Sequence, residues 1–250
     1  MLKNQLLIFD LDDTLIDTSD VYWRARTSFG KKLLEEFSGK QNINEKTIIK
    51  EFERIDSLNM KTWGFNPHRY GKTMFDTYDF FCQKFDHKPV KETLSHIHLC
   101  GNIIVNEIPK PINGAKHLLD WAVKQYKLVL ITRGEDSFQK LKLNKLGMRQ
   151  YFSLVEVVSK KDASVFEKVL KITGYQSKNT WIIGDSIKSD INPGIQIKAN
   201  CVLYSYKHPH YFWLQDSESF ALGYFYRISK LEELKEILRA PSDFTMVSEV

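Results

Sequence analysis

The sequence has few cysteines and no long hydrophobic run. Its three cysteines, Cys82, Cys100 and Cys201, are odd in number and far apart, which argues against a disulfide framework. No apolar stretch approaches the roughly 20 residues that a membrane-spanning helix needs. The opening residues MLKNQLLIFDLDDT do not resemble a secretory signal, because acidic residues follow a very short apolar run. We therefore expect a cytoplasmic protein with no membrane partner.

A strong net charge is absent too. The 250 residues carry 36 basic and 31 acidic side chains, and a balance of +5 does not by itself indicate a nucleic-acid partner. The basic excess lies in residues 101–200, which hold 16 basic and 9 acidic side chains. We expect much of it to form the solvated face of one helix, which carries Lys140, Lys142, Lys145 and Arg149. Aromatic residues make up 13% of the chain, which argues against disorder.

Short apolar runs alternate with amphipathic segments through the second half of the chain. The runs predict strands at residues 6–9, 128–131, 154–158, 181–183 and 201–204. The segments between them predict helices at residues 116–126, 136–146 and 163–173, with a short one at 191–197. This alternation predicts an α/β protein with a doubly wound parallel sheet.

The region between the first two strands has a different character. Apolar residues recur at helical spacing from residue 20 to about 106, interrupted by one irregular stretch at residues 61–72. Because one strand cannot bury itself, the first strand must join the later sheet, and the helical block is an insertion. We expect a core domain of residues 1–16 and 108–240, a helical domain of residues 17–107 and a tail of residues 241–250. Hinge motion is expected near residues 16–18 and 107–113.

Ligands of doubly wound sheets bind at the carboxyl ends of the strands. Four strand ends carry polar side chains, namely Asp10 and Asp12, then Thr132 and Arg133, then Lys160 and Lys161, then Asp185, Ser186 and Asp190. Close carboxylates repel one another unless a cation neutralises them, and Mg²⁺ prefers oxygen ligands. Phosphoryl transfer needs a nucleophile, charge neutralisation and donors to the phosphoryl oxygens. These strand ends supply all three.

The same residues resemble the four motifs of the haloacid dehalogenase-like superfamily. The matching elements are Asp10-x-Asp12-x-Thr14, Thr132, a downstream lysine, and Gly184-Asp185-Ser186-x3-Asp190, in the family's order and spacing. The resemblance implies a Rossmann-like core with an inserted helical cap of the C1 type. It also implies Mg²⁺ as the cofactor and a small phosphorylated substrate.

The resemblance further implies a role for each residue. Asp10 would be the nucleophile that forms an aspartyl-phosphate, and Asp12 the general acid and base. Asp10, the main-chain carbonyl of Asp12 and Asp185 would bind Mg²⁺. Thr132, Arg133 and Lys161 would bind the phosphoryl group. Ser186 and Asp190 would lie one layer behind these groups, and Asp190 would orient the lysine or a metal-bound water.

Two choices stay open within this resemblance. Both Lys160 and Lys161 lie at permitted distances before Phe166, and the run Lys161-Asp162 favours Lys161. The superfamily's dehalogenases lack the second Asp, so Asp12 favours a phosphatase. A phosphomutase with the same core and a regulatory binding protein with a vestigial site are the alternatives. The oligomeric state is expected to be a monomer or a homodimer.

Two segments rich in aromatic and basic residues allow two interpretations. One is the irregular stretch with Trp63, Phe65, His68, Arg69, Tyr70 and Lys72, and the other is residues 204–213. Each is interpreted either as a contributor to substrate specificity or as internal packing, and packing is favoured.

Overall fold

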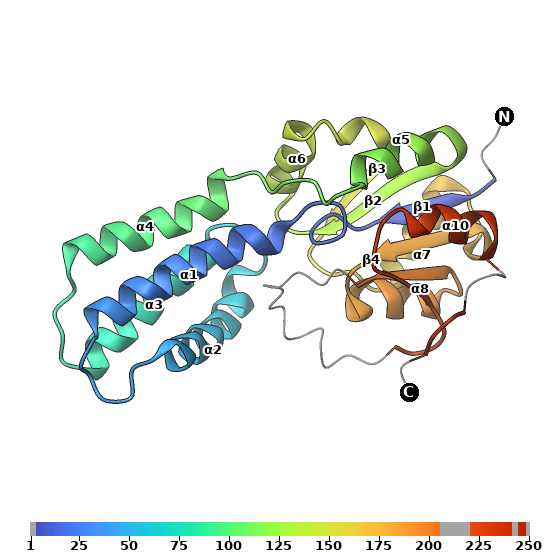
Figure 1. The fold of residues 1–250 in the computed structure, drawn as a ribbon. Coiled ribbons are helices and arrows are strands. Elements are labelled where there is room, and N and C mark those ends of the chain that lie inside the picture. Colours follow the sequence, from blue (N-terminus) through green and yellow to red (C-terminus); the bar gives the residue numbers. More distant parts are fainter. Residues whose placement is uncertain (1–3, 206–220, 242–244, 249–250) are drawn as a thin grey trace. The chain divides into compact units, whose positions relative to one another are not determined.

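A computed structural model describes residues 4–205, 221–241 and 245–248 of the chain. The chain divides into two compact units, Met1–Ser19 with Pro109–Val250, and Asp20–Ile108 (Figure 1). Among the described residues, no helix is both long enough and apolar enough to cross a membrane.

The first unit contains a six-stranded parallel sheet in the order β3-β2-β1-β4-β5-β6. Its strands are β1 (Leu6–Phe9), β2 (Lys127–Arg133), β3 (Leu154–Val158), β4 (Thr180–Gly184), β5 (Asn200–Tyr204) and β6 (Tyr226–Ile228). Phe9 pairs with Leu130 on one side and with Ile183 on the other, so β1 lies in the middle of the sheet. The predicted α/β class with a parallel sheet is confirmed.

Helices pack on both faces of this sheet. Leu7 and Phe9 face a cluster that includes residues of α5 (Ala115–Gln125), α6 (Asp136–Lys145) and α10 (Glu233–Arg239). Leu6 and Ile8 face the opposite cluster, which includes residues of α7 (Ala163–Thr173). Successive residues of a strand point to opposite faces, so a strand that is apolar throughout is buried by both layers.

Two elements of this unit were not predicted from the sequence. β6 has only three residues, too few for a recognisable apolar run, and α10 follows it. The short helix expected at residues 191–197 is divided between a π-helical turn, η3 (Ile187–Ile191), and α8 (Asn192–Gln196). The remaining helical turns are η1 (Arg149–Tyr151) and η2 (Ser177–Asn179).

The second unit is helical. It holds α1 (Thr18–Glu36), whose first two residues belong to the first unit, α2 (Glu45–Trp63), α3 (Arg69–Lys84) and α4 (Lys91–Asn106). Its buried core is rich in aromatic side chains, among them Phe29, Phe37, Phe52, Tyr78 and Phe81. The irregular stretch expected at residues 61–72 is shorter in the structure, because α2 continues through Trp63 and α3 begins at Arg69.

The two connections to the helical unit run beside each other. Ile16 and Pro111 form an isolated β-bridge, and the Asp17 amide donates to the Lys110 carbonyl at 2.8 Å. Both connections therefore leave the first unit next to the loop that follows β1.

Candidate active site

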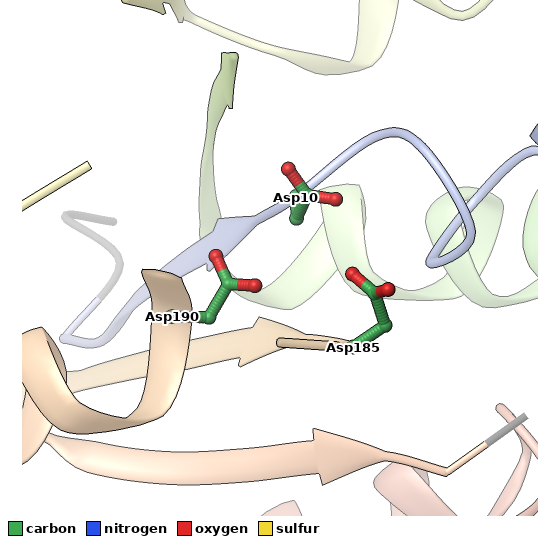
Figure 2. Close-up of side chains that lie close together, drawn as sticks. All are labelled: Asp10, Asp185 and Asp190. Carbon is green, nitrogen blue, oxygen red and sulfur yellow. The ribbon is translucent and has the colours of Figure 1, made fainter. Parts of the chain in front are cut away.

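Three carboxylates lie together at the carboxyl ends of β1 and β4. Asp10 directly follows β1, Asp185 directly follows β4, and Asp190 lies in the π-helical turn beyond it (Figure 2). Each offers an oxygen, and these oxygens all lie within 4.8 Å of one another. A set of carboxylate oxygens suits a hard divalent cation such as Mg²⁺.

Lys161 contacts two of the three carboxylates of this cluster. It precedes α7, is 6% exposed, and donates from Nζ to Asp10 and, at 2.8 Å, to Asp190. Burial lowers the pKa of Lys161, but the charges of Asp10 and Asp190 outweigh it and hold the pKa above its usual value. Lys160, by contrast, has a side chain that is 79% exposed and pairs with Asp162. The structure thus places Lys161, and not Lys160, against Asp10.

The cluster carries more negative charge than Lys161 offsets. Burial, aided by the charges of Asp190 and Asp12, raises the pKa of Asp10 to about 7 despite the lowering effect of Lys161. Burial and the nearby charge of Asp10 also raise the pKa of Asp185 well above its usual value. A bound cation would offset these charges, so both the chemistry and the electrostatics of the donors fit a divalent metal.

The backbone around β4 is built to bring Asp190 inward. The Ser186 amide donates to Asp190 Oδ2 at 3.2 Å, and Ser186 Oγ accepts from the Ser189 amide at 3.1 Å. A Cβ placed on Gly184 would lie 2.2 Å from Asp190 Cγ. Glycine at this position therefore makes room for the carboxylate that holds Lys161.

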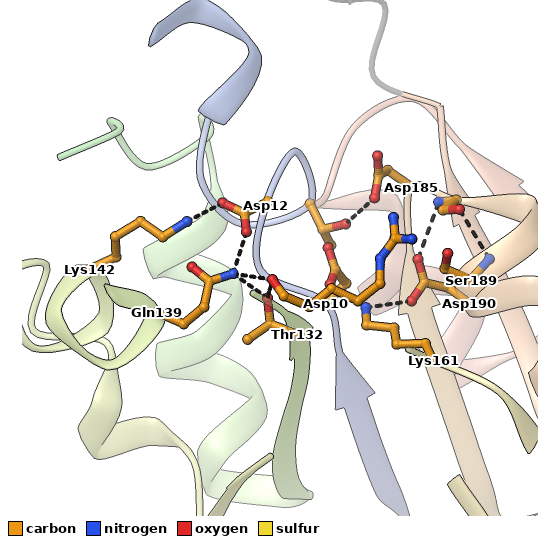
Figure 3. Close-up of polar contacts among 12 residues, drawn as sticks. Asp10, Asp12, Thr132, Gln139, Lys142, Lys161, Asp185, Ser189 and Asp190 are labelled. Carbon is orange, nitrogen blue, oxygen red and sulfur yellow. Dashed lines mark hydrogen bonds and ion pairs between the residues drawn. The ribbon is translucent and has the colours of Figure 1, made fainter. Parts of the chain in front are cut away.

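Asp12 lies near Asp10 but has a separate set of partners (Figure 3). Its Oδ1 accepts from Thr18 Oγ1 and from Lys142 Nζ, both at 2.5 Å, and its Oδ2 accepts from Gln139 Nε2 at 2.7 Å. Burial raises the pKa of Asp12, but the charge of Lys142 and these hydrogen bonds outweigh it, so the pKa lies below its usual value.

Lys142 corrects an expectation drawn from the sequence. It was expected on a solvated helix face, yet it is 3% exposed and its ammonium contacts Asp12. Lys140 and Lys145 on the same helix are exposed as expected. A lysine in a helix is usually exposed, and only the fold brings Asp12 next to this one.

The end of β2 contributes Thr132 and Arg133. Thr132 is fully buried, and its Oγ1 accepts from Gln139 Nε2 at 2.8 Å, while the Arg133 carbonyl accepts from the same nitrogen at 2.6 Å. Gly134 follows with a φ of +152°, and a Cβ there would lie 2.8 Å from Gln139 Cγ. The turn between β2 and α6 therefore admits Gln139 because its residue is glycine.

The loop after β1 is fixed by its own side chains. Asp13 has a φ of +57° and accepts hydrogen bonds from the Ser19 amide at 2.8 Å and from Ser19 Oγ at 2.7 Å. Asp tolerates this left-handed conformation better than most residues. Thr14 Oγ1 donates to Asp185 Oδ1 at 3.4 Å, which links the loop to the end of β4.

The structure brings most of the candidate residues into two connected groups. Asp10, Lys161, Asp185 and Asp190 form one, with Ser186 behind it, and Asp12 and Thr132 share Gln139 in the other. The carboxylate of Asp12 is not part of the three-carboxylate cluster. The contact expected between the main-chain carbonyl of Asp12 and the metal stays a prediction. The sequence did not indicate Gln139 or Lys142 as residues of the site.

The aromatic and basic stretch of the helical unit is partly internal. Arg69 is 3% exposed and pairs with Asp56, and the Tyr70 ring packs edge-on against Tyr22 and Phe52. Trp63 and Phe65 are 41% and 36% exposed. Packing therefore accounts for Arg69 and Tyr70. Of the second stretch, residues 206–213 lie outside the described residues.

Comparison with known proteins identifies the family. Residues 5–197 match the family model of the haloacid dehalogenase-like hydrolases. The chain belongs to this family. Among solved haloacid dehalogenase-like structures, a family hydrolase from Xanthomonas campestris superposes with a TM-score of 0.74 at 21% identity and covers 94% of this chain and 95% of its own. The magnesium-bound hydrolase YfnB from Bacillus subtilis superposes with a TM-score of 0.62 at 20% identity, covering 95% and 99%.

A phosphatase and a nucleotidase are similar to the chain in sequence as well. The glyceraldehyde 3-phosphate phosphatase of Methanocaldococcus jannaschii is 26% identical over 246 residues, which cover 93% of this chain and 96% of that protein. The pyrimidine 5′-nucleotidase YjjG of Escherichia coli is 29% identical over 139 residues, which cover 53% and 58%. The predicted superfamily is confirmed, and so is the prediction of an enzyme of the phosphoric monoester hydrolase type.

Proposed function

We propose that this haloacid dehalogenase-like enzyme is a Mg²⁺-dependent phosphatase that hydrolyses a small phosphorylated metabolite through an aspartyl-phosphate. The observation that carries the proposal is the pairing of Asp10 with Lys161 beside Asp185, with a second, separately held carboxylate, Asp12, next to them. The pKa of Asp10 is raised and that of Asp12 is lowered in the metal-free protein, which is the reverse of what a nucleophile and a general acid need. The two roles therefore require that a bound cation ionises Asp10 and that Asp12 takes up a proton before the first step.

In the first step an oxygen of Asp10 attacks phosphorus and the bond to the leaving oxygen breaks. Asp12 donates a proton to that oxygen, so the substrate leaves as an alcohol and the phosphoryl group stays on Asp10. Lys161 and Thr132 bind the phosphoryl oxygens as charge develops on them, and we assign Arg133 to the same group.

In the second step water attacks the phosphorus of the aspartyl-phosphate. Asp12 accepts a proton from that water, the bond between phosphorus and Asp10 breaks, and inorganic phosphate leaves with both carboxyl groups restored to their starting states. Asp10 and Asp185, with the main-chain carbonyl of Asp12, would hold Mg²⁺. When bound, the ion would neutralise charge on the carboxylates and on the phosphoryl oxygens.

The helical unit, Asp20–Ile108, is proposed to act as a cap over this site. Both of its connections leave the first unit beside the loop that carries Asp10 and Asp12. A lid attached at that loop would exclude water from the reaction and add contacts to the leaving group. Its side chains would then select the substrate.

A phosphorylated triose is the first substrate class to test. The match to a glyceraldehyde 3-phosphate phosphatase spans 93% of the chain, helical unit included, whereas the match to a pyrimidine 5′-nucleotidase spans 53%. Pyrimidine nucleoside monophosphates are therefore the second class.

Phosphate release from both substrate classes and from p-nitrophenyl phosphate, with MgCl₂ or with EDTA, tests the proposal. Asp10→Asn should abolish turnover. Lys161→Met should lower it by ~100-fold or more, while its exposed neighbour is the matched control, so Lys160→Met should keep wild-type turnover. Wild-type turnover by Asp10→Asn would refute the mechanism. An isomeric phosphate ester without free phosphate would indicate a phosphomutase, and no turnover of any ester would indicate a vestigial site.

A further inference from the structure

The carboxylate of Asp12 is held by residues from far along the chain. Gln139 Nε2 contacts its Oδ2 at 2.7 Å and Lys142 Nζ contacts its Oδ1 at 2.5 Å, across 127 and 130 residues of sequence. The Lys142 side chain is 4% exposed, whereas that of Asp12 is 28% exposed. Asp12 is thus accessible to a ligand, and Lys142 lies behind it.

The local structure of α6 favours this arrangement. Gln139 and Lys142 are three residues apart, so they lie on the same face of the helix. The Glu135 side chain accepts from the amides of Ser137 and Phe138, which fixes where the helix begins. The ring of Phe138 lies 5.2 Å from Lys142 Nζ. The helix therefore presents both donors to Asp12 from a defined position.

Burying a lysine is unfavourable unless its charge is paired. Among the residues that the structure describes, Lys142 forms its ion pair with Asp12. Gln139 has a second task, because the nitrogen that binds Asp12 also binds Thr132 Oγ1 at 2.8 Å. One side chain thus fixes the distance between the carboxylate and a hydroxyl at the end of β2.

We propose that Lys142 and Gln139 are positioning residues, which hold the Asp12 carboxylate at the angle and distance from which it exchanges a proton with the leaving group. This rests on the proposed function, in which Asp12 is the general acid. Lys142 and Gln139 are buried and contact Asp12, so we assign each of them an effect through its neighbours and no contact with the substrate. In the proton transfer both act through Asp12, while Gln139 also holds Thr132, and displacing a catalytic group by ~1 Å can cost ~100-fold in rate.

The leaving group supplies a test that a purely structural role would not pass. The alkoxide of glyceraldehyde 3-phosphate is a poor leaving group that needs a proton, whereas p-nitrophenolate leaves readily without one. The ratio kcat/KM reports the steps up to phosphorylation of Asp10. Lys142→Met should therefore lower kcat/KM ~100-fold for glyceraldehyde 3-phosphate and less than ~10-fold for p-nitrophenyl phosphate.

Two further variants complete the design. Gln139→Leu, which removes a neutral donor and keeps the side-chain size, should change the same ratio in the same direction even if Lys142→Met does not fold. Lys145→Met alters an exposed lysine of the same helix and should leave both rates unchanged. In an Asp12→Asn background, Lys142→Met should lower kcat/KM for p-nitrophenyl phosphate no further.

The outcomes separate the inference from the function on which it rests. Equal losses for the two esters in Lys142→Met or Gln139→Leu, or no loss in either, would overturn the positioning role while wild-type turnover upheld the phosphatase. A wild-type protein that hydrolysed neither ester would overturn both. A further loss in the Asp12→Asn background would show that Lys142 acts by some route other than Asp12.

Discussion

Replacing the proposed nucleophile should stabilise the metal-free protein. Asp10 is 8% exposed, and its surroundings raise its pKa from the usual 3.8 to about 7. One pKa unit corresponds to about 1.4 kcal/mol, so above pH 7 ionised Asp10 costs the folded state about 4 kcal/mol. Asparagine has the same shape and cannot ionise. Asp10→Asn therefore should remove this cost at the same time as it removes activity.

The sign of the effect fixes its dependence on pH. An acid whose pKa is raised by folding binds protons more tightly in the folded state, so its contribution to stability is present below about pH 4 and is lost as pH rises through 7. The advantage of Asp10→Asn in the free energy of unfolding should be about 2 kcal/mol at pH 5 and about 4 kcal/mol at pH 8.

Urea denaturation in EDTA at the two pH values measures this difference. Asp136→Asn is the matched control, because Asp136 is an exposed carboxylate at the start of α6 and its side chain is 61% exposed. That variant should change stability by a small and equal amount at both pH values. The reasoning is refuted if Asp10→Asn is less stable than the wild type at pH 8, or if its advantage does not grow with pH.

Three further predictions concern Asp10, Gly184 and Glu36. Because protons compete with the metal at Asp10, stabilisation by MgCl₂ in thermal-shift titrations should be weak at pH 6 and strong at pH 8. The same MgCl₂ concentration at the midpoint of both titrations would contradict this. Gly184→Ala places a Cβ against Asp190 and should lower kcat by roughly 10–100-fold in steady-state assays, with unchanged turnover as the contrary result. In the helical unit, Glu36 is a buried acceptor for Tyr78 and His87, so Glu36→Ala should cost roughly 2–3 kcal/mol in urea denaturation, and a cost below ~0.5 kcal/mol would contradict it.

Much of the catalytic rim could be predicted because its signals are local. Asp10 and Asp185 each follow an apolar strand that is buried on both faces, and such strands stand out in a sequence. Parallel strands then bring their carboxyl ends to one edge of the sheet, whatever lies between them in the chain.

Lys142 and Gln139 show where local signals end. Both lie on a helix in which charged residues are frequent, and neither has a pattern that distinguishes it from its exposed neighbours. Their burial depends on where α6 packs and on the path of the loop after β1, which is more than 120 residues away. β6 was missed for a different reason, since its three residues are stabilised by pairing with β5 and not by a pattern of their own.

The bridge between Ile16 and Pro111 also has a consequence for the order of folding. The central strand β1 must pair with β2, and about ninety residues separate the two ends of the insertion. Closing a flexible loop of that length costs about 3 kcal/mol more in chain entropy than closing a loop of a few residues. If the four helices form first, their ends are already close and most of that entropy has been lost before the sheet assembles. The folded insertion would then bring β1 and β2 close together before they pair.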